Sequence, residues 1–431
     1  MAIVAAAGAE VDPGDTAWML IATALVLVMT PALGLFYAGL VRGKNTLNTF
    51  MMCVAALAVA TVMWALVGYS IAFDEGNGFI GGLGHAFLRG VAFAPREDTT
   101  IPHLLFMAFQ ATFCIVTVAL VSGAVVERMR FGPFLVFAGL WSVLVYAGAL
   151  GLRRRLAPGA RDSRLRRRWP SRWGPASRRW RPRWSSGRGR TTDARRSCPT
   201  TRSMCVGAGL LWFGWFGFNG GSGFSTGNSS VLAFTNTLLC PAATLSVWFG
   251  LDLLRGRQVT AIGAATAIIV GCVLITPAGG FISPGSAMLL GALGALPSYA
   301  IIVLRPRTRV DETLDVLAAH GAAGLTGILF IGFFAQEVWN GVADGLLYGN
   351  AAQLGWQALA AVATPVYAFV VTFVLLRVIG LVMPLRATER EEALGMDIVQ
   401  HGEEAYATGE GAILVTPEDG VKVPPPVADP A

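Results

Sequence analysis

Residues 207–222 combine aromatic rings, glycines and a polar end in one apolar run, Gly-Ala-Gly-Leu-Leu-Trp-Phe-Gly-Trp-Phe-Gly-Phe-Asn-Gly-Gly-Ser. Aromatic ring faces bind small cations through their negative quadrupole. The hydroxyl of Ser222 can accept a hydrogen bond from an N–H group. Glycines in a membrane helix let neighbouring backbones approach closely. The run therefore fits either a site for a small cation or an aromatic surface that packs a helix bundle.

His320 lies in an otherwise apolar run between Val316 and Gly324. An ionisable residue inside a membrane span is a functional hypothesis by default, and imidazole can relay a proton near neutral pH. We expect Asp315, five residues earlier, to orient the site or to pair with a backbone group. A membrane enzyme using both residues is an alternative, but this offset puts them on different faces of a helix. We read the other three histidines as solvated: His85, His103 and His401.

The composition is that of a polytopic, all-α membrane protein. Hydrophobic residues make up 54% of the chain and charged residues 14%, against about 25% charged residues in a soluble protein. The first ten residues have no basic region, so we do not expect a cleaved signal peptide. The six cysteines show no CxxC spacing, and no Gly-Lys-Ser/Thr phosphate loop is present. Neither a metal site, a cofactor nor ATP-driven pumping is indicated.

Ten apolar runs are long enough to be membrane spans. They lie at 16–40, 48–73, 102–126, 132–150, 205–226, 231–253, 259–278, 284–304, 314–335 and 357–380. Arg42 and Lys44 follow the first run, so the positive-inside rule places the N-terminus outside and the C-terminus in the cytoplasm. The expected organisation is an outer N-terminus (1–14), four spans (15–150), an anomalous segment (151–203), the remaining spans (204–381) and a cytoplasmic tail (382–431).

The anomalous segment 151–203 holds 18 of the 33 basic residues, all arginine, against only Asp162 and Asp193. The orientation rule requires one more crossing here, but no apolar run is present. One interpretation is an arginine arm that binds RNA or anionic lipid. We favour a stretch translated out of frame, because a one-base shift turns the glycine codon GGC of a GC-rich gene into the arginine codon CGG. On that interpretation no nucleic-acid partner is expected.

Several motifs together resemble the ammonium transporter family, which includes the Amt proteins, methylammonium permeases and Rh proteins, and the likeness is to its bacterial members. They are Asp15–Leu20, Met29–Arg42, Phe109–Phe113, Glu127–Phe131, Gly207–Ser222, Ile275–Gly279 and Asp311–Gly321. The resemblance implies eleven spans, ten of them in two inverted five-helix halves. It also implies a homotrimer in which each protomer has a pore. The family's fifth span and the first histidine of a pore pair belong where 151–203 stands. An alternate frame places Glu at that position, as in some members.

The resemblance also implies roles for individual residues. Phe109 and Ser222 match the outer ammonium site, whose tryptophan falls in the anomalous segment. Phe113 and Phe218 match two stacked rings that close the pore, although each phenylalanine could instead pack a core. His320 matches the second histidine of the pore pair, which assists passage of ammonium and methylammonium.

Trp215 precedes Phe218 by three residues, so we expect it to line the pore from the same face of the helix. The acidic tail is either disordered or, as in the family, packed under the trimer, where it meets a PII-type signalling protein. Besides uptake across a bacterial inner membrane, two alternatives stay open: an ammonium sensor that signals through its tail, and a frame-shifted chain without activity. Methylammonium uptake in a transporter-deficient cell would distinguish a transporter from these alternatives.

Overall fold

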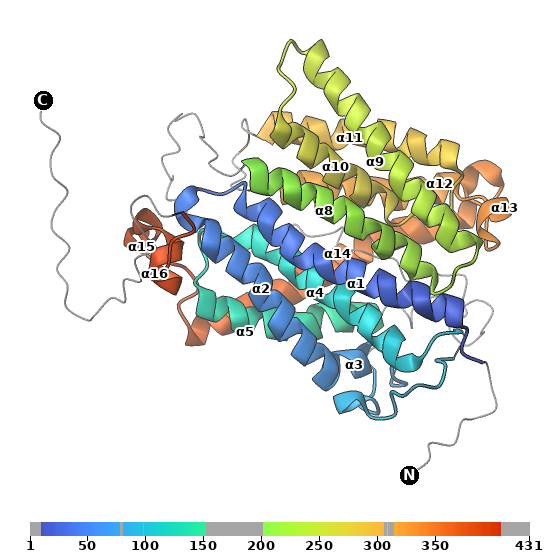
Figure 1. Cartoon of the computed structure of the whole chain (residues 1–431), viewed down its shortest axis with the longest axis horizontal. Coiled ribbons are helices and arrows are strands. Elements are labelled where there is room, and N and C mark those ends of the chain that lie inside the picture. Colours follow the sequence, from blue (N-terminus) through green and yellow to red (C-terminus); the bar gives the residue numbers. More distant parts are fainter. Residues whose placement is uncertain are drawn as a thin grey trace, which may run out of the picture.

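The structure is a computed structural model that describes residues 10–77, 81–97, 99–151, 201–305, 308 and 314–406. These ranges form a bundle of helices and contain no β-strand (Figure 1). The long helices are α1 (Pro13–Ala38), α2 (Thr46–Met63), α4 (His103–Val125), α5 (Phe131–Trp141), α8 (Thr201–Gly220), α9 (Asn228–Leu254), α10 (Ala261–Ile275), α11 (Pro284–Leu304), α12 (Ala323–Phe334) and α14 (Ala351–Val382). Short helices are α3 (Tyr69–Phe73), α13 (Glu337–Asn340), α15 (Glu389–Leu394) and α16 (Met396–His401).

Short π-helical and 3-10 turns interrupt or join these helices. The π-helical turns are η2 (Trp64–Gly68), η4 (Ser142–Ala147) and η7 (Leu317–Ala322). The 3-10 turns are η1 (Gly43–Asn45), η3 (Ala86–Leu88), η5 (Gly221–Gly223) and η8 (Leu346–Tyr348). π-Helical turns are rare and frequently mark functional sites, and η7 is the turn that carries His320.

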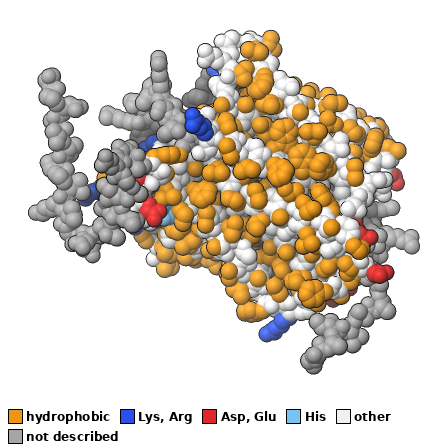
Figure 2. All heavy atoms as spheres, in the orientation of Figure 1, with side chains coloured by type: hydrophobic (Ala, Val, Ile, Leu, Met, Phe, Trp, Pro, Cys, Tyr) orange, Lys and Arg blue, Asp and Glu red, His pale blue; other side chains and the backbone are white. Residues whose placement is uncertain are grey.

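The predicted all-α membrane fold is confirmed. Within the described ranges, 8 helical segments are long and apolar enough to cross a membrane. Figure 2 shows hydrophobic side chains spread over the visible face, while the few charged side chains in view lie near its edges. All ten apolar runs are helical, but α8 begins at Thr201 and so includes Arg202, which the prediction had left in the anomalous segment. The interval where the fifth span was expected, 152–200, lies outside the described residues.

Glycines let α8 lie directly against α1 (Figure 1). A Cβ atom at Gly207 would lie 2.5 Å from the backbone nitrogen of Phe36, and one at Gly214 would lie 2.7 Å from the carbonyl oxygen of Leu25. Residues seven apart return to the same face of a helix after two turns. The two glycines therefore form a seam at which the α1 and α8 backbones touch. This seam fixes α8 against the middle and the C-terminal part of α1.

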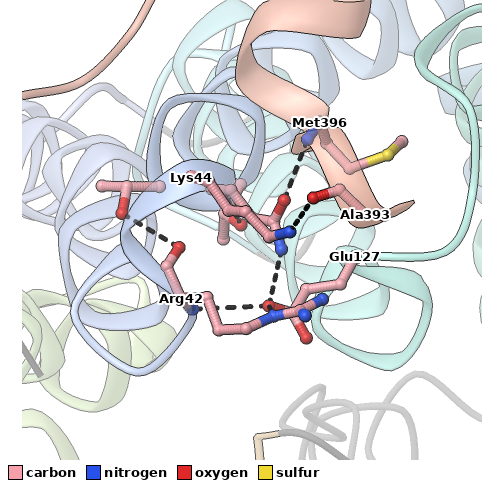
Figure 3. Close-up of polar contacts among 8 residues, drawn as sticks. Arg42, Lys44, Glu127, Ala393 and Met396 are labelled. Carbon is pink, nitrogen blue, oxygen red and sulfur yellow. Dashed lines mark hydrogen bonds and ion pairs between the residues drawn. The ribbon is translucent and has the colours of Figure 1, made fainter. Parts of the chain in front are cut away.

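The tail packs against the loops that precede α2 and α5. One Glu127 carboxylate oxygen accepts hydrogen bonds from Arg42 Nε at 3.0 Å and from Asn45 Nδ2 at 2.7 Å. Asn45 Oδ1 in turn accepts from the backbone N–H of Met396 at 2.9 Å, and the Lys44 ammonium group donates to a carbonyl of α15 (Figure 3). Glu127 and Asn45 thus connect the body of the protein to its tail.

The helix α16 is attached to the N-terminus of α2. The Asp397 carboxylate accepts hydrogen bonds from the backbone N–H groups of Leu47 at 3.0 Å and Asn48 at 2.8 Å. His401 Nε2 lies 3.1 Å from Asn48 Oδ1, and its ring is half-buried. The prediction of a solvated His401 was therefore wrong. The described part of the tail, up to residue 406, is ordered by these contacts, and the residues beyond lie outside the described ranges.

Candidate functional site

Three of the predicted phenylalanines form one column between α4 and α8. Phe109 and Phe113 are one turn apart on α4, and their ring centroids are 4.9 Å apart with an edge-to-face geometry. Phe113 lies 4.2 Å from Phe218 of α8, and the planes of these two rings are inclined by 33°. All three side chains are buried. The sequence-based pairing of Phe113 with Phe218 therefore has the geometry of two rings in contact.

Ser222 lies one turn beyond Phe218. Its hydroxyl donates a hydrogen bond of 2.6 Å to the carbonyl oxygen of Phe218, so the hydroxyl proton is used and the oxygen lone pairs can accept. The preceding residue, Gly221, contacts Phe109 so closely that an added Cβ would lie 3.0 Å from that ring. Ser222 and Phe109 are therefore close neighbours at one end of the column, here called the mouth end.

Trp215 extends the aromatic column toward α10. Its ring centroid lies 5.6 Å from that of Phe218, and its indole N–H donates a 2.8 Å hydrogen bond to the Thr276 hydroxyl. α10 packs against both α8 and η7, so it links this part of the column to the turn that holds His320. His320 is 6% exposed. That Trp215 and His320 line a pore stays a prediction.

Asp315 is at the start of η7, in a left-handed backbone conformation with φ of 52°. Its backbone carbonyl accepts from Ala319 N at 2.9 Å, and its carboxylate forms an ion pair with Arg305, which follows α11. Sequence reasoning expected an orienting role but did not identify Arg305 as the partner. The ion pair attaches the turn that carries His320 to the end of α11.

Two histidines at the mouth end are not solvated as predicted. His103 Nε2 lies 2.5 Å from the Tyr69 hydroxyl, and the His85 and His103 rings are 5.4 Å apart edge to face. Both rings are half-buried. The prediction failed because it judged each histidine by its neighbours in the sequence. Tyr69 lies far from His103 in the sequence, and only the fold brings the two side chains together. Among the described residues, no group of three or more histidine, cysteine, aspartate and glutamate side chains is arranged to hold a metal ion.

Sequence reasoning also missed two aromatic residues next to the column. The rings of Phe106 and Phe224 are 5.0 Å apart, and the Phe224 ring lies 5.7 Å from that of Phe109. Phe106 precedes Phe109 by one helical turn, and Phe224 follows Ser222 by two residues. Those spacings were the available signal, because both residues are close in sequence to a predicted site residue.

Comparison with known proteins identifies the family. The family model described as Ammonium Transporter Family matches residues 17–151 and 182–406. The chain belongs to the ammonium transporter family. The gap in this match, 152–181, lies inside the anomalous segment and is shorter than it. An ammonium transporter of Bacillus subtilis is 39% identical over 407 residues, which cover 91% of this chain and 98% of that protein. One of Aquifex aeolicus is 38% identical over 409 residues, covering 93% and 95%.

Solved structures of ammonium transporter family members have the same fold. Saccharomyces cerevisiae Mep2 superposes with a TM-score of 0.74 at 28% identity, over 89% of each chain. Candida albicans Mep2 gives a TM-score of 0.75 at 28% identity, over 89% of this chain and 88% of that one. A sensor Amt protein superposes with a TM-score of 0.74 at 22% identity, over 90% and 98% of the chains, a likeness of fold alone. The chain is thus a multi-pass membrane protein of a family of ammonium transporters.

Proposed function

We propose that this protein takes up ammonium and methylammonium across a bacterial inner membrane, with its N-terminus outside and its tail in the cytoplasm. The cation binds at the mouth end, gives a proton to water there, and passes as a neutral amine between Phe113 and Phe218 and along His320. The observation that carries the proposal is the order of groups in the column. A hydrogen-bond acceptor and an aromatic ring come first, and two rings in contact follow.

That order matches the energetics of moving ammonium. Removing the cation from water costs several kcal/mol unless the site replaces its hydration. Phe109 can supply a cation–π contact worth up to ~2 kcal/mol when desolvated. Ser222 supplies a lone pair, because its own proton is used on the Phe218 carbonyl. Beyond them, Phe113 and Phe218 make the next part of the path apolar, and a neutral amine crosses an apolar region at lower cost than a cation.

His320 supports the proposal through its place in the fold. It is a buried ionisable side chain on a π-helical turn within the segment Leu317–Phe334, which is apolar enough to span a membrane. A neutral imidazole has one donor and one acceptor nitrogen, so it can hydrogen-bond ammonia or relay a proton. The ion pair between Asp315 and Arg305 would then hold the turn in place. Trp215 contributes an apolar wall beside Phe218.

The proposal includes two kinds of partner that the resemblance implies. One is two further copies of this chain in a homotrimer, and the other is a PII-type regulatory protein at the tail. The contacts of Met396 and Asp397 with the rest of the protein hold the tail in one place, which gives a PII-type protein a defined surface to bind. The mass of the detergent-solubilised protein, alone and with a PII-type protein, tests both.

The experiment for the function is methylammonium uptake in cells that lack their own ammonium transporters. Two versions would be expressed at matched membrane levels: the chain as printed, and one whose gene is restored to a single frame across codons 148–204. We expect uptake that ammonium competes away in the restored version. Absence of uptake by both versions would overturn the transport proposal and favour the alternative of a sensor.

A further inference from the structure

Phe224 is held in a backbone conformation that phenylalanine rarely adopts. Its φ is 55° and its ψ is 19°, in the left-handed region. For a residue with a side chain this conformation costs roughly 1–2 kcal/mol. Such strain persists only where surrounding contacts impose it, and it is concentrated at functional sites. Glycine would occupy this position without strain, and glycine is common in the neighbouring sequence, so the presence of a phenylalanine requires an explanation.

Contacts on either side of Phe224 hold its loop, and one set comes from Asp15, near the start of α1. Its carboxylate accepts a 2.6 Å hydrogen bond from the backbone N–H of Thr226 and a 2.9 Å bond from the Thr226 hydroxyl. It also accepts from the Thr100 hydroxyl. On the other side, the backbone N–H of Phe224 donates to the Gly221 carbonyl at 2.9 Å. The loop that carries Ser222 and Phe224 is thus fixed at both ends.

The fixed loop places the Phe224 ring over the column. The ring packs against Phe106 and Phe109, with centroid distances of 5.0 Å and 5.7 Å. Phe109 is 0% exposed, whereas Phe224 is half-buried. Phe224 is therefore the partly exposed member of this group, and it lies against the ring that carries the proposed cation contact.

The same aromatic group already contacts a positive charge. The guanidinium carbon of Arg96 lies 4.1 Å from the centroid of Phe106 and 5.1 Å from that of Phe73. Cations are attracted to ring faces within about 6 Å of the centroid. A ring face of Phe106 is thus occupied by a cation of the protein itself. Arg96 thus already uses the Phe106 ring, so a further cation in this group would contact Phe224 or Phe109 instead.

We propose that Phe224 is a cation-binding ring of the mouth, which contacts the ammonium ion before Phe109 does and so sets affinity and preference among small alkylammonium ions. The inference rests on the proposed function and adds a specificity-determining residue to it. Asp15 is a positioning residue, because it holds this loop through Thr226 and joins it to the segment before α4 through Thr100.

The test measures binding of radiolabelled methylammonium to the purified full chain, both as printed and in the frame-restored version, so it does not depend on transport. Phe224→Leu keeps an apolar side chain of similar size but removes the ring, while Phe224→Trp keeps a ring with a stronger quadrupole. Phe216→Leu is the matched control, because Phe216 packs on Phe234 at 4.6 Å, a ring pair without a contact to the column. We expect Phe224→Leu to raise the apparent Kd roughly tenfold, in line with a cation–π contact of up to ~2 kcal/mol. Phe224→Trp should keep or lower it, and Phe216→Leu should leave it unchanged.

Each other outcome is decisive. An unchanged Kd in Phe224→Leu, or an equal weakening in Phe224→Trp, would overturn the role of the ring while leaving the proposed function intact. An equal weakening in Phe216→Leu would show a general loss of structure and also overturn it. Absence of methylammonium binding by both the printed chain and the frame-restored version, each measured against a sodium control, would overturn the proposed mouth site itself.

Discussion

At the scale of single residues, some polar side chains use their polar atoms in hydrogen bonds within the protein. Others keep an atom that can still accept a hydrogen bond from a ligand. The Trp215 indole N–H donates to the Thr276 hydroxyl and the Trp212 indole N–H donates to the Thr237 carbonyl, so both groups are used internally. Ser222 differs, because its bond to Phe218 uses the hydroxyl proton and leaves the oxygen able to accept. This is the property that a site for an N–H cation requires.

Ser222→Ala should therefore weaken the recognition of ammonium. The substitution removes one acceptor, and a hydrogen bond to a charged group is worth about 1.5–3 kcal/mol. We expect the half-saturation concentration for methylammonium uptake by the frame-restored protein to rise roughly tenfold. Competition by unlabelled ammonium should weaken in parallel. An unchanged half-saturation concentration would contradict the assignment of Ser222.

Phe113→Ala should alter transport more than stability, because a ring that closes a pore is not a main element of packing. The comparison is Phe137→Ala on α5, whose side chain is 1% exposed in the core. A core phenylalanine truncated to alanine costs about 3–5 kcal/mol. We expect Phe137→Ala to lower the unfolding temperature of the detergent-solubilised protein clearly, and Phe113→Ala to lower it less while changing uptake. Equal destabilisation by both would make Phe113 a packing residue.

At the scale of helices, the seam between α1 and α8 determines where the mouth residues lie. Gly207 and Gly214 bring the two backbones into contact, and lipid supplies no hydrophobic force to compensate for a looser fit. Asp15 is at one end of this seam and Ser222 at the same end of α8. Small shifts of α8 along α1 would therefore change the loop geometry directly.

Gly214→Ala should loosen this seam. The new Cβ would lie 2.3 Å from Met29 Cγ and 2.7 Å from the Leu25 carbonyl oxygen, so the helices must separate. Overpacking of this kind costs about 1–3 kcal/mol. Gly209→Ala is the matched control on the same helix, since a Cβ there meets nothing within 4 Å. We expect a lower unfolding temperature for Gly214→Ala alone, and similar temperatures for both variants would argue against the seam.

The tail gives a prediction about pH. Burial lowers the pKa of His401 below its usual value of about 6.5, with the nearby Glu403 opposing that effect. The docked tail thus favours neutral imidazole. Its contribution to docking is complete above the usual pKa and is lost as pH falls through the lowered one. On α16 itself, the charged side chain besides His401 is Asp397. From the rest of the protein, Asn48 and Phe131 contact the His401 ring.

Hydrogen–deuterium exchange of residues 389–401, corrected for intrinsic rates, should therefore speed up from pH 7.5 to pH 5.5. His401→Gln keeps a group able to hydrogen-bond Asn48 but cannot titrate. It should remove the part of the pH effect that His401 carries. The same pH dependence in both proteins would assign the effect to other groups of the tail.

These elements also show what could be predicted from the sequence. Apolar runs give the helices, because their length reflects the membrane thickness, and recognition of the motifs gave the column around Phe113 and Phe218. The ends of α8 and α14 were missed by several residues, since polar turns at helix ends carry no apolar signal. The hydrogen bonds between Asp15 and Thr226 could not be predicted from the local sequence pattern. These two residues are brought together only by the folded bundle.

At the scale of the whole molecule, the family match and the charge distribution point to the same interval. The match stops at 151 and resumes at 182, and this gap falls where the arginines are concentrated. On both sides of the gap the chain follows the family for well over a hundred residues. A continuous protein that departs from its family over one short, highly charged interval is what a local frame shift would produce.

The last prediction concerns that interval in the chain as printed. It has 18 arginines in residues 151–203, where the resemblance to the family implies a membrane span. A single central arginine costs roughly 2.5–3.5 kcal/mol for insertion, so several in one window cannot be offset by the few apolar neighbours. The interval should stay out of the membrane, and the bundle should lose one helix and the first member of the pore pair. We therefore expect methylammonium uptake by the frame-restored version and none by the printed one, at matched membrane levels. Equal uptake by the two would show that the arginine-rich segment is genuine and that the proposed missing span is not needed.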